Sequence, residues 1–201
     1  MSAPIPNDIR LVRASDLEQS RRSARAAIDL TGRLAHFRGV GTTTLAAVLT
    51  ARMQAAGQTV AWISATADVV YPPDLAAASV DLRALAFVLA ADALQAARAA
   101  EHLLRSRAFA LLIVDLEDGA GISDAAQGRL LRLARNGEAG VLCISHGDRP
   151  LRGSMISLRG LVSRERTAGG RYRVRVRITR DKQGGPGVRS GEDCYAPTGM
   201  R

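Results

Sequence analysis

The sequence predicts an α/β protein, with a mostly parallel sheet flanked by helices and an antiparallel hairpin appended at the C-terminal end. Five apolar runs of strand length alternate with helical patterns between residues 33 and 145. At about Gly147 this pattern gives way to two alternating strands joined by a Gly-containing turn. Continuously apolar strands that alternate with helices are typical of a parallel sheet covered on both faces.

The first half of the chain supplies three of these strands. Residues 14–31 read as an amphipathic helix, with Ser15 as N-cap and Glu18 as its capping-box partner. A strand at 33–38 then leads through GVGTTT into a helix that Gly57 ends. Further strands follow at 59–64 and 85–90, separated by a turn and a short helix that begin at YPPDLAAA.

The second half continues the alternation and then departs from it. A helix at 91–106 precedes FALLIVDL (109–116), the strongest buried strand, and a second helix ended by Gly137 precedes GVLCIS (140–145). Residues 154–165 and 171–179 predict the hairpin. We therefore expect an N-terminal helix at 1–31, a core at 32–182 that includes the basic hairpin, and a flexible tail at 183–201.

Composition and charge narrow the classes of function. The 201 residues suffice for one domain, and aromatic residues make up only 3%, which disfavours nucleic-acid binding by base stacking. Most of the net charge of +9 lies in residues 152–201, which carry 12 Arg and Lys against 4 Asp and Glu. The sequence has two cysteines, no metal-ligand spacing, no secretory signal and no apolar span of membrane length. We expect a cytoplasmic protein with reduced cysteines and no bound metal or membrane partner.

Arginine at every second position of RYRVRVRITRDK gives the last predicted strand one basic face. That face consists of Arg171, Arg173, Arg175 and Arg177. It is a candidate surface for DNA phosphates. The alternative is a solvated face whose charges protect a sheet edge from unwanted pairing.

The order of strand, Gly-rich turn, helix and later strand ending in aspartate is the layout of a P-loop nucleotide-binding domain. A functional loop requires G-x-x-x-x-G-K-[ST], whose backbone N–H groups surround the phosphates and whose lysine neutralises them. Here one residue separates Gly39 from Gly41, and Thr42 occupies the lysine position. Thr43 and Asp115 stand at the positions of the two magnesium-directed groups. The same residues also fit structural roles, as helix N-caps and as a strand-end carboxylate bonded to backbone.

With these residues in place, the chain resembles the core of the RecA-type recombinases, most closely their ImuA-like branch, from about Thr31 to about Pro186. TGRLAHF and GTTTL are similar to the recombinase's entry strand, loop and helix, and FALLIVD is similar to its Walker B strand. VLCISH is similar to the strand ending in a polar pair that reports nucleotide state, here Ser145 and His146. RVRVRITRDKQGGPG is similar to the late strand and turn that reach a neighbouring subunit, with Arg180 and Lys182 at the matching positions.

The departures from the family imply that catalysis is lost. Thr66 stands at the position of the glutamate that would activate a water, and DGAGIS and GDRPLRG are shorter than the family's DNA-binding loops. The resemblance thus implies a RecA-like accessory protein of DNA-damage-induced mutagenesis, without cofactor or enzymatic activity. Its implied partners are RecA and an inactive Y-family polymerase homologue of the mutasome. A DNA-binding repair protein that acts through the arginine strand is one alternative, and a divergent ATPase is another.

Overall fold

The structure is a computed structural model that describes residues 28–66, 70–166, 171–184 and 187–195, with the backbone alone for Arg171 and 187–195. Its strands are β1 (Leu34–Arg38), β2 (Val60–Ala65), β3 (Leu85–Leu89), β4 (Leu111–Leu116), β5 (Gly140–Ser145), β6 (Leu158–Arg166), β7 (Arg171–Asp181) and β8 (Gly187–Tyr195). Its helices are α2 (Thr42–Ala55), α3 (Pro72–Ala77), the 3-10 turn η1 (Leu82–Ala84), α4 (Ala93–Ser106) and α5 (Asp124–Asn136). No helix in these ranges has the length and apolar character needed to cross a membrane.

One sheet contains the eight strands of the described residues, in the order β3-β2-β4-β5-β1-β6-β7-β8. The six strands from β3 to β6 are parallel, and β7 and β8 are antiparallel to their neighbours. The predicted α/β class, with a mostly parallel sheet and an antiparallel C-terminal hairpin of β6 and β7, is confirmed. The predicted strands and the helices that follow Gly41 lie within a few residues of their expected bounds.

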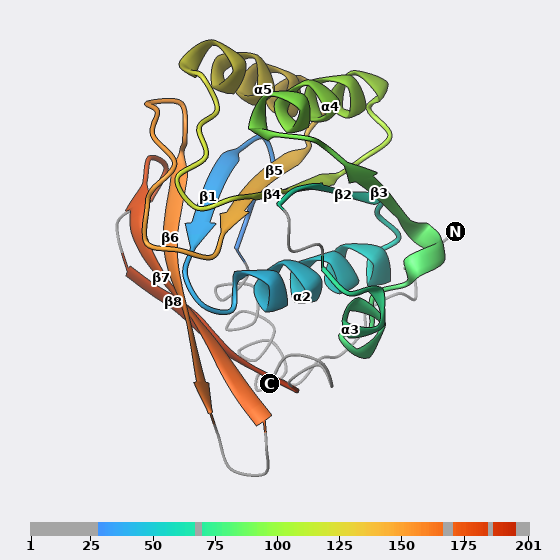
Figure 1. Ribbon diagram of the computed structural model, residues 1–201, viewed down its shortest axis with the longest axis vertical. Helices are drawn as coiled ribbons and strands as arrows, with labels where there is room; N and C mark the ends of the chain where they lie inside the picture. Colours follow the sequence, from blue (N-terminus) through green and yellow to red (C-terminus); the bar gives the residue numbers. More distant parts are fainter. Residues whose placement is uncertain (1–27, 67–69, 167–170, 185–186, 196–201) are drawn as a thin grey trace, which may run out of the picture.

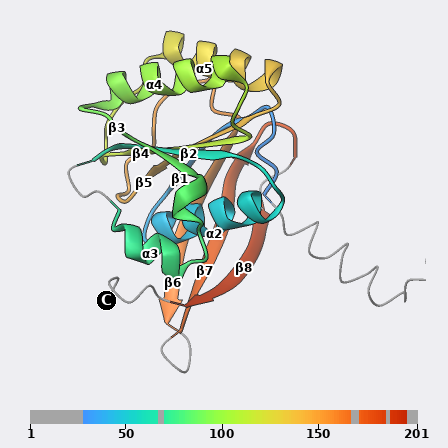
Figure 2. The ribbon, with the colours of Figure 1, turned by 90° about the vertical axis from the view of Figure 1, so that its right-hand side faces the viewer.

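Helices cover both faces of the parallel part (Figures 1 and 2). Helices α4 and α5 pack on one face and α2 and α3 on the other. Because side chains alternate along a strand, β1 contributes Leu34 to the α4–α5 side and Phe37 to the α2–α3 side. Burial of apolar side chains against helices on both faces is the main force that holds the layers together. The antiparallel strands run past α2 at one side of the molecule.

The expectations for the two ends of the chain have different outcomes. The predicted N-terminal helix falls mostly in residues 1–27, outside the described residues, and residues 28–30 are not helical. The expected flexible tail is wrong for residues 187–195, which form β8 and pair with β7 along its length. The physical reason is that the outer edge of β7 carries backbone donors and acceptors that a neighbouring strand satisfies, whatever its own composition.

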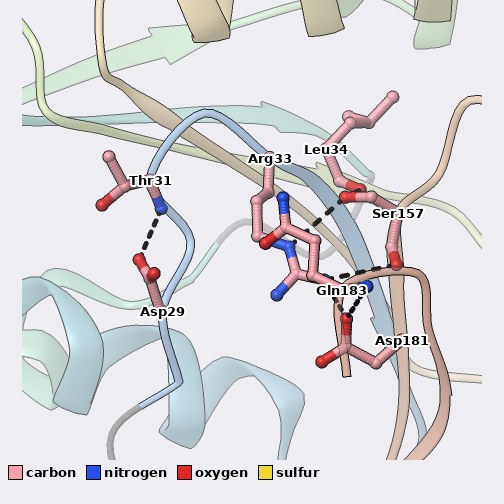
Figure 3. A network of polar contacts seen from close by, with 7 residues as sticks. All are labelled: Asp29, Thr31, Arg33, Leu34, Ser157, Asp181 and Gln183. Carbon is pink, nitrogen blue, oxygen red and sulfur yellow. Dashed lines mark hydrogen bonds and ion pairs between the residues drawn. The ribbon is translucent and has the colours of Figure 1, made fainter. Parts of the chain in front are cut away.

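A buried ion pair joins the beginning of β1 to the end of β7 (Figure 3). The Arg33 guanidinium contacts the Asp181 carboxylate, and the two side chains are only 4% and 2% exposed. Arg33 also donates to the Ser157 carbonyl oxygen at 3.4 Å. Burial raises the pKa of Asp181, but the hydrogen bonds from Arg33 and from the Gln183 backbone outweigh it and hold that pKa below its ordinary value.

Asp181→Asn leaves the Arg33 charge buried without a counter-ion, and we expect a loss of about 3 to 5 kcal/mol in the free energy of unfolding at pH 7. Because folding lowers the pKa of Asp181 below its ordinary 3.8, the unfolded chain binds the extra proton on acidification. The difference in the free energy of unfolding between the unaltered protein and Asp181→Asn is therefore fully present above pH 3.8 and decreases below it. Urea denaturation at pH 7 and pH 3 measures both.

Asp148→Asn is the matched control, because its exposed carboxylate lies 3.6 Å from Arg38. We expect almost no change in stability from this variant, since solvent screens an exposed pair. Equal losses from Asp181→Asn and Asp148→Asn at pH 7 would contradict the role given to the buried pair.

Candidate functional site

A crevice opens at the carboxyl ends of β1 and β5, which are neighbours in the sheet. After β1 the chain leads to α2 on one face, whereas after β5 it crosses the opposite face, where Leu151 and Ile156 join the core beneath α4 and α5. Neighbouring strands whose connections leave to opposite faces create the usual ligand position in a parallel α/β sheet. The predicted nucleotide-site residues all lie along this edge, at the ends of β1, β2, β4 and β5.

The turn between β1 and α2 lies directly against β6. Gly39 and Gly41 have φ angles of 111° and 99°, which favour glycine. The Gly39 N–H donates to the Ser145 carbonyl oxygen at 3.1 Å. A Cβ on Gly39 would lie 2.4 Å from the Val162 carbonyl oxygen, so strand β6 passes directly against the turn. The space that a longer loop would occupy is filled by the protein's own backbone.

Thr42, His146 and Asp115 form a line of polar groups beside this turn. The Thr42 Oγ1 lies 3.3 Å from His146 Nδ1, and the His146 Nε2 lies 3.4 Å from Asp115 Oδ1. Hydroxyl, imidazole and carboxylate in this order also occur in nucleophilic catalysis. Thr42, however, is completely buried, and its hydroxyl is within donating distance of the Gly39 and Ser145 carbonyl oxygens. A substrate has no access to it, so the line is a structural contact and not a catalytic triad.

Asp115 is almost fully buried. Its Oδ1 receives no hydrogen bond from any described residue, although His146 Nε2 lies only 3.4 Å away. The 3.4 Å approach therefore lacks hydrogen-bond alignment and is best regarded as an electrostatic contact. Ser64 on β2 lies in register with Asp115, and its hydroxyl is 3.5 Å from that of Thr66. The structure thus places Thr66 beside the Asp115 end of the sheet, with Thr43 half-buried in the first turn of α2.

Ser145, expected at an interface, is instead buried. Its Oγ lies 3.1 Å from His36 Nε2, and the His36 Nδ1 accepts from the Leu151 N–H at 3.3 Å. Since Nδ1 is an acceptor, the proton lies on Nε2, which donates to Ser145. Burial and then the positive charges of Arg159 and Arg38 lower the pKa of His36 to about 4, so the ring is neutral at physiological pH. Only His146 of the predicted polar pair, half-exposed, reaches the crevice.

The two short loops after β4 and β5 are bonded to each other. The Asp118 carboxylate accepts from the Arg149 N–H at 3.1 Å. A Cβ on Gly147 would lie 2.1 Å from the Asp118 side chain, which shows how closely the loops approach.

The arginine strand is β7, and its basic side chains lie on the α4–α5 side of the sheet. Arg173, Arg175 and Arg177 alternate with the buried Val174 and Val176, as predicted, while the Arg171 side chain lies outside the described residues. Of the expected interface residues, Arg180 is exposed, and Lys182 is exposed with its ammonium donating to the Ser154 carbonyl oxygen.

The sequence did not indicate an apolar surface at the other edge of the sheet. Strand β3 is an edge strand, and Phe87 and Leu89 are 40% and 69% exposed. In the sequence LAFVLA these residues fit a buried strand, because the pattern does not show which strand lies at an edge. The one feature of the sequence that could have indicated this exposed apolar edge is that LAFVLA contains no charged residue.

Comparison of the sequence with protein-family models and with curated proteins gave no match. Within the described ranges, no three His, Cys, Asp or Glu side chains gather as a metal site would require.

Gly39→Ala tests the contact between the turn and β6, with Gly57→Ala as its control. Both glycines have positive φ, which costs about 1 to 2 kcal/mol for alanine. Nothing lies within 4 Å of a Cβ on Gly57, whereas Gly39 faces Val162. We expect Gly39→Ala to lower the free energy of unfolding by about 1 to 3 kcal/mol more than Gly57→Ala. Equal losses in a denaturant titration would mean that β6 yields without cost.

Proposed function

We propose that this protein is a non-catalytic, RecA-like accessory protein of DNA-damage-induced mutagenesis, which acts in the cytoplasm by binding RecA and a Y-family-like polymerase homologue of the mutasome. The proposal combines the family resemblance of the sequence motifs with a crevice whose nucleotide-directed groups face inward. Thr42 is buried, Asp115 is screened by His146, and β6 adjoins the short loop. A domain of this kind acts through its surfaces.

The observation that favours a protein partner is the edge formed by β3. Among the described residues, no strand neighbours its outer backbone N–H and C=O groups, and Leu82, Phe87 and Leu89 expose apolar side chains beside it. Edge strands are usually protected by charges, proline or a bulge, and residues 85–90 contain none of the first two. An edge with exposed backbone and apolar side chains suits a partner that adds a strand or packs a hydrophobic segment.

The partner side chains would lie on the α2–α3 side of β3. Phe87 is in register with the buried Trp62, while Ala86 and Val88 on the opposite side pack with α4. Phe87 and Leu89 are thus free of the α4 core, and polar substitutions there spare the packing that holds β3 in place. This separation makes the edge testable without loss of the fold.

Mg–ATP gives the first test, since the proposal excludes nucleotide binding in the crevice. We expect no heat of binding that depends on Mg²⁺ when Mg–ATP is titrated into the protein, because the lysine is absent and Thr42 is buried. A P-loop ATPase with an intact loop serves as the positive control. Saturable Mg²⁺-dependent heat, or phosphate release above background, would support the divergent ATPase instead.

The second test is binding to RecA, measured with and without single-stranded DNA. We expect the unaltered protein to bind, and Phe87→Ser with Leu89→Ser to weaken binding about tenfold or more, as loss of central apolar anchors does. Met155→Ser, at a residue that is also exposed but lies in the loop before β6, should bind like the unaltered protein.

Lys182→Ala tests the surface that the sequence resemblance points to. A loss from Lys182→Ala with none from the β3 variant would move the contact to the end of β7 and refute the edge assignment. If the unaltered protein recovers neither RecA nor the polymerase homologue in a pull-down, the proposed function itself is wrong.

A further inference from the structure

Acidic neighbours divide the arginine face of β7 into two halves. Arg175 makes an ion pair with Glu165 at 3.4 Å. Arg173 lies in register between Glu165 on β6 and Asp193 on β8. The Glu165 carboxylate therefore compensates part of the charge of this half, although the sequence pattern makes all the arginines equivalent.

Arg177, at the other end of the face, and Arg180, which a β-bulge brings to the same side of β7, have no such compensation among the described residues. Both residues are exposed, and neither makes an ion pair with any described residue. Leu161 and Val188 are the cross-strand neighbours of Arg177. Asp181, next in the chain, is directed inward to Arg33. Among the described residues, no ion pair offsets the positive charge of Arg177 and Arg180.

Further cations lie beside Arg180. Arg159 faces it across β6 and β7, and it donates to the Gly153 carbonyl oxygen at 2.9 Å, which fixes its position. The pKa of Arg159 is lowered first by burial and then by the positive charges of Arg180 and Arg38. These three guanidinium groups are therefore close enough to repel one another. A bound anion relieves such repulsion.

A groove of about 610 Å³ adjoins Arg177 at the crevice. The part of β6 that extends beyond the end of β1 forms one wall of the groove. The Gly39–Val40 turn and the His146–Asp148 loop form the other wall. Arg164 and Arg177 are the arginines that line it. The one acid in the lining, Asp148, directs its carboxylate into solvent near Arg38. The groove is therefore basic, and it is continuous with the uncompensated half of the arginine face.

We propose that this basic groove and the adjoining Arg177 and Arg180 bind the phosphodiester backbone of a single nucleic-acid strand. The ring of Tyr172, the one aromatic residue of β7, is covered by the Arg164 guanidinium, whose carbon lies 4.6 Å from the ring centroid. Binding thus uses phosphates and not base stacking, and it is independent of sequence and steeply dependent on salt.

Two double variants of β7 test the proposal, because each removes two charges from the same face of the same strand. We expect Arg177→Ser with Arg180→Ser to weaken binding of a fluorescent single-stranded oligonucleotide about tenfold at low salt and to reduce the log–log salt slope by about 1.4. Arg173→Ser with Arg175→Ser should change the affinity less than about twofold. Arg177→Lys with Arg180→Lys, which retains the charge, should keep most of the binding. Melting temperatures verify that each variant is folded.

Duplex DNA and inorganic tripolyphosphate are the comparison ligands. The proposal expects both to bind at least about tenfold more weakly than the single strand, because a rigid duplex does not enter the groove and a short anion reaches few of its charges. Equal losses from the two serine variants, tripolyphosphate binding as tight as the oligonucleotide, or no binding of the single strand at low salt would each overturn it. The result is independent of RecA binding, so either proposal can fail alone.

Discussion

The buried contact between Arg33 and Asp181 ties the end of the antiparallel strand β7 to the start of the parallel strand β1. Removing both charges from water is costly, and their attraction offsets that cost only in one geometry. In that geometry the Ser157 carbonyl oxygen accepts a further hydrogen bond from Arg33. The contact therefore specifies an arrangement more than it adds stability. It fixes Asp181 opposite Leu158 at the start of β6. A shift of one residue would place arginines in the core and Val174 and Val176 in solvent.

The sheet carries two dissimilar surfaces at different parts. The apolar edge lies on β3, the first strand in the spatial order, whereas the basic face lies on β7, beside the last. Between them, at the carboxyl ends of the parallel strands, Thr42, His146 and Asp115 contact one another beside the groove along β6. Molecules that contacted the β3 edge and the β7 face would therefore meet different parts of the sheet.

The parts of the fold that follow from local pattern could be predicted from the sequence. Continuous apolar runs such as 109–116 identify the parallel strands, and parallel connectivity then brings Asp115 and His146 to one edge. What depends on distant contacts could not be predicted. Strand β8 contains glycines typical of a tail and is a strand because β7 needs a neighbour. Glu165 and Arg175 form their ion pair only once the hairpin has formed, and the hydrogen bond between Ser145 and His36 requires β5 and β1 to be neighbours.

The contact of Gly39 with Val162 limits what the turn between β1 and α2 can accommodate. A lysine at position 42 and three more residues in the turn would complete the P-loop motif on paper. The Val162 carbonyl oxygen of β6, however, lies where even one carbon added at Gly39 does not fit. A longer turn would therefore require a different path for β6, which is fixed on one side by β1 and on the other by β7.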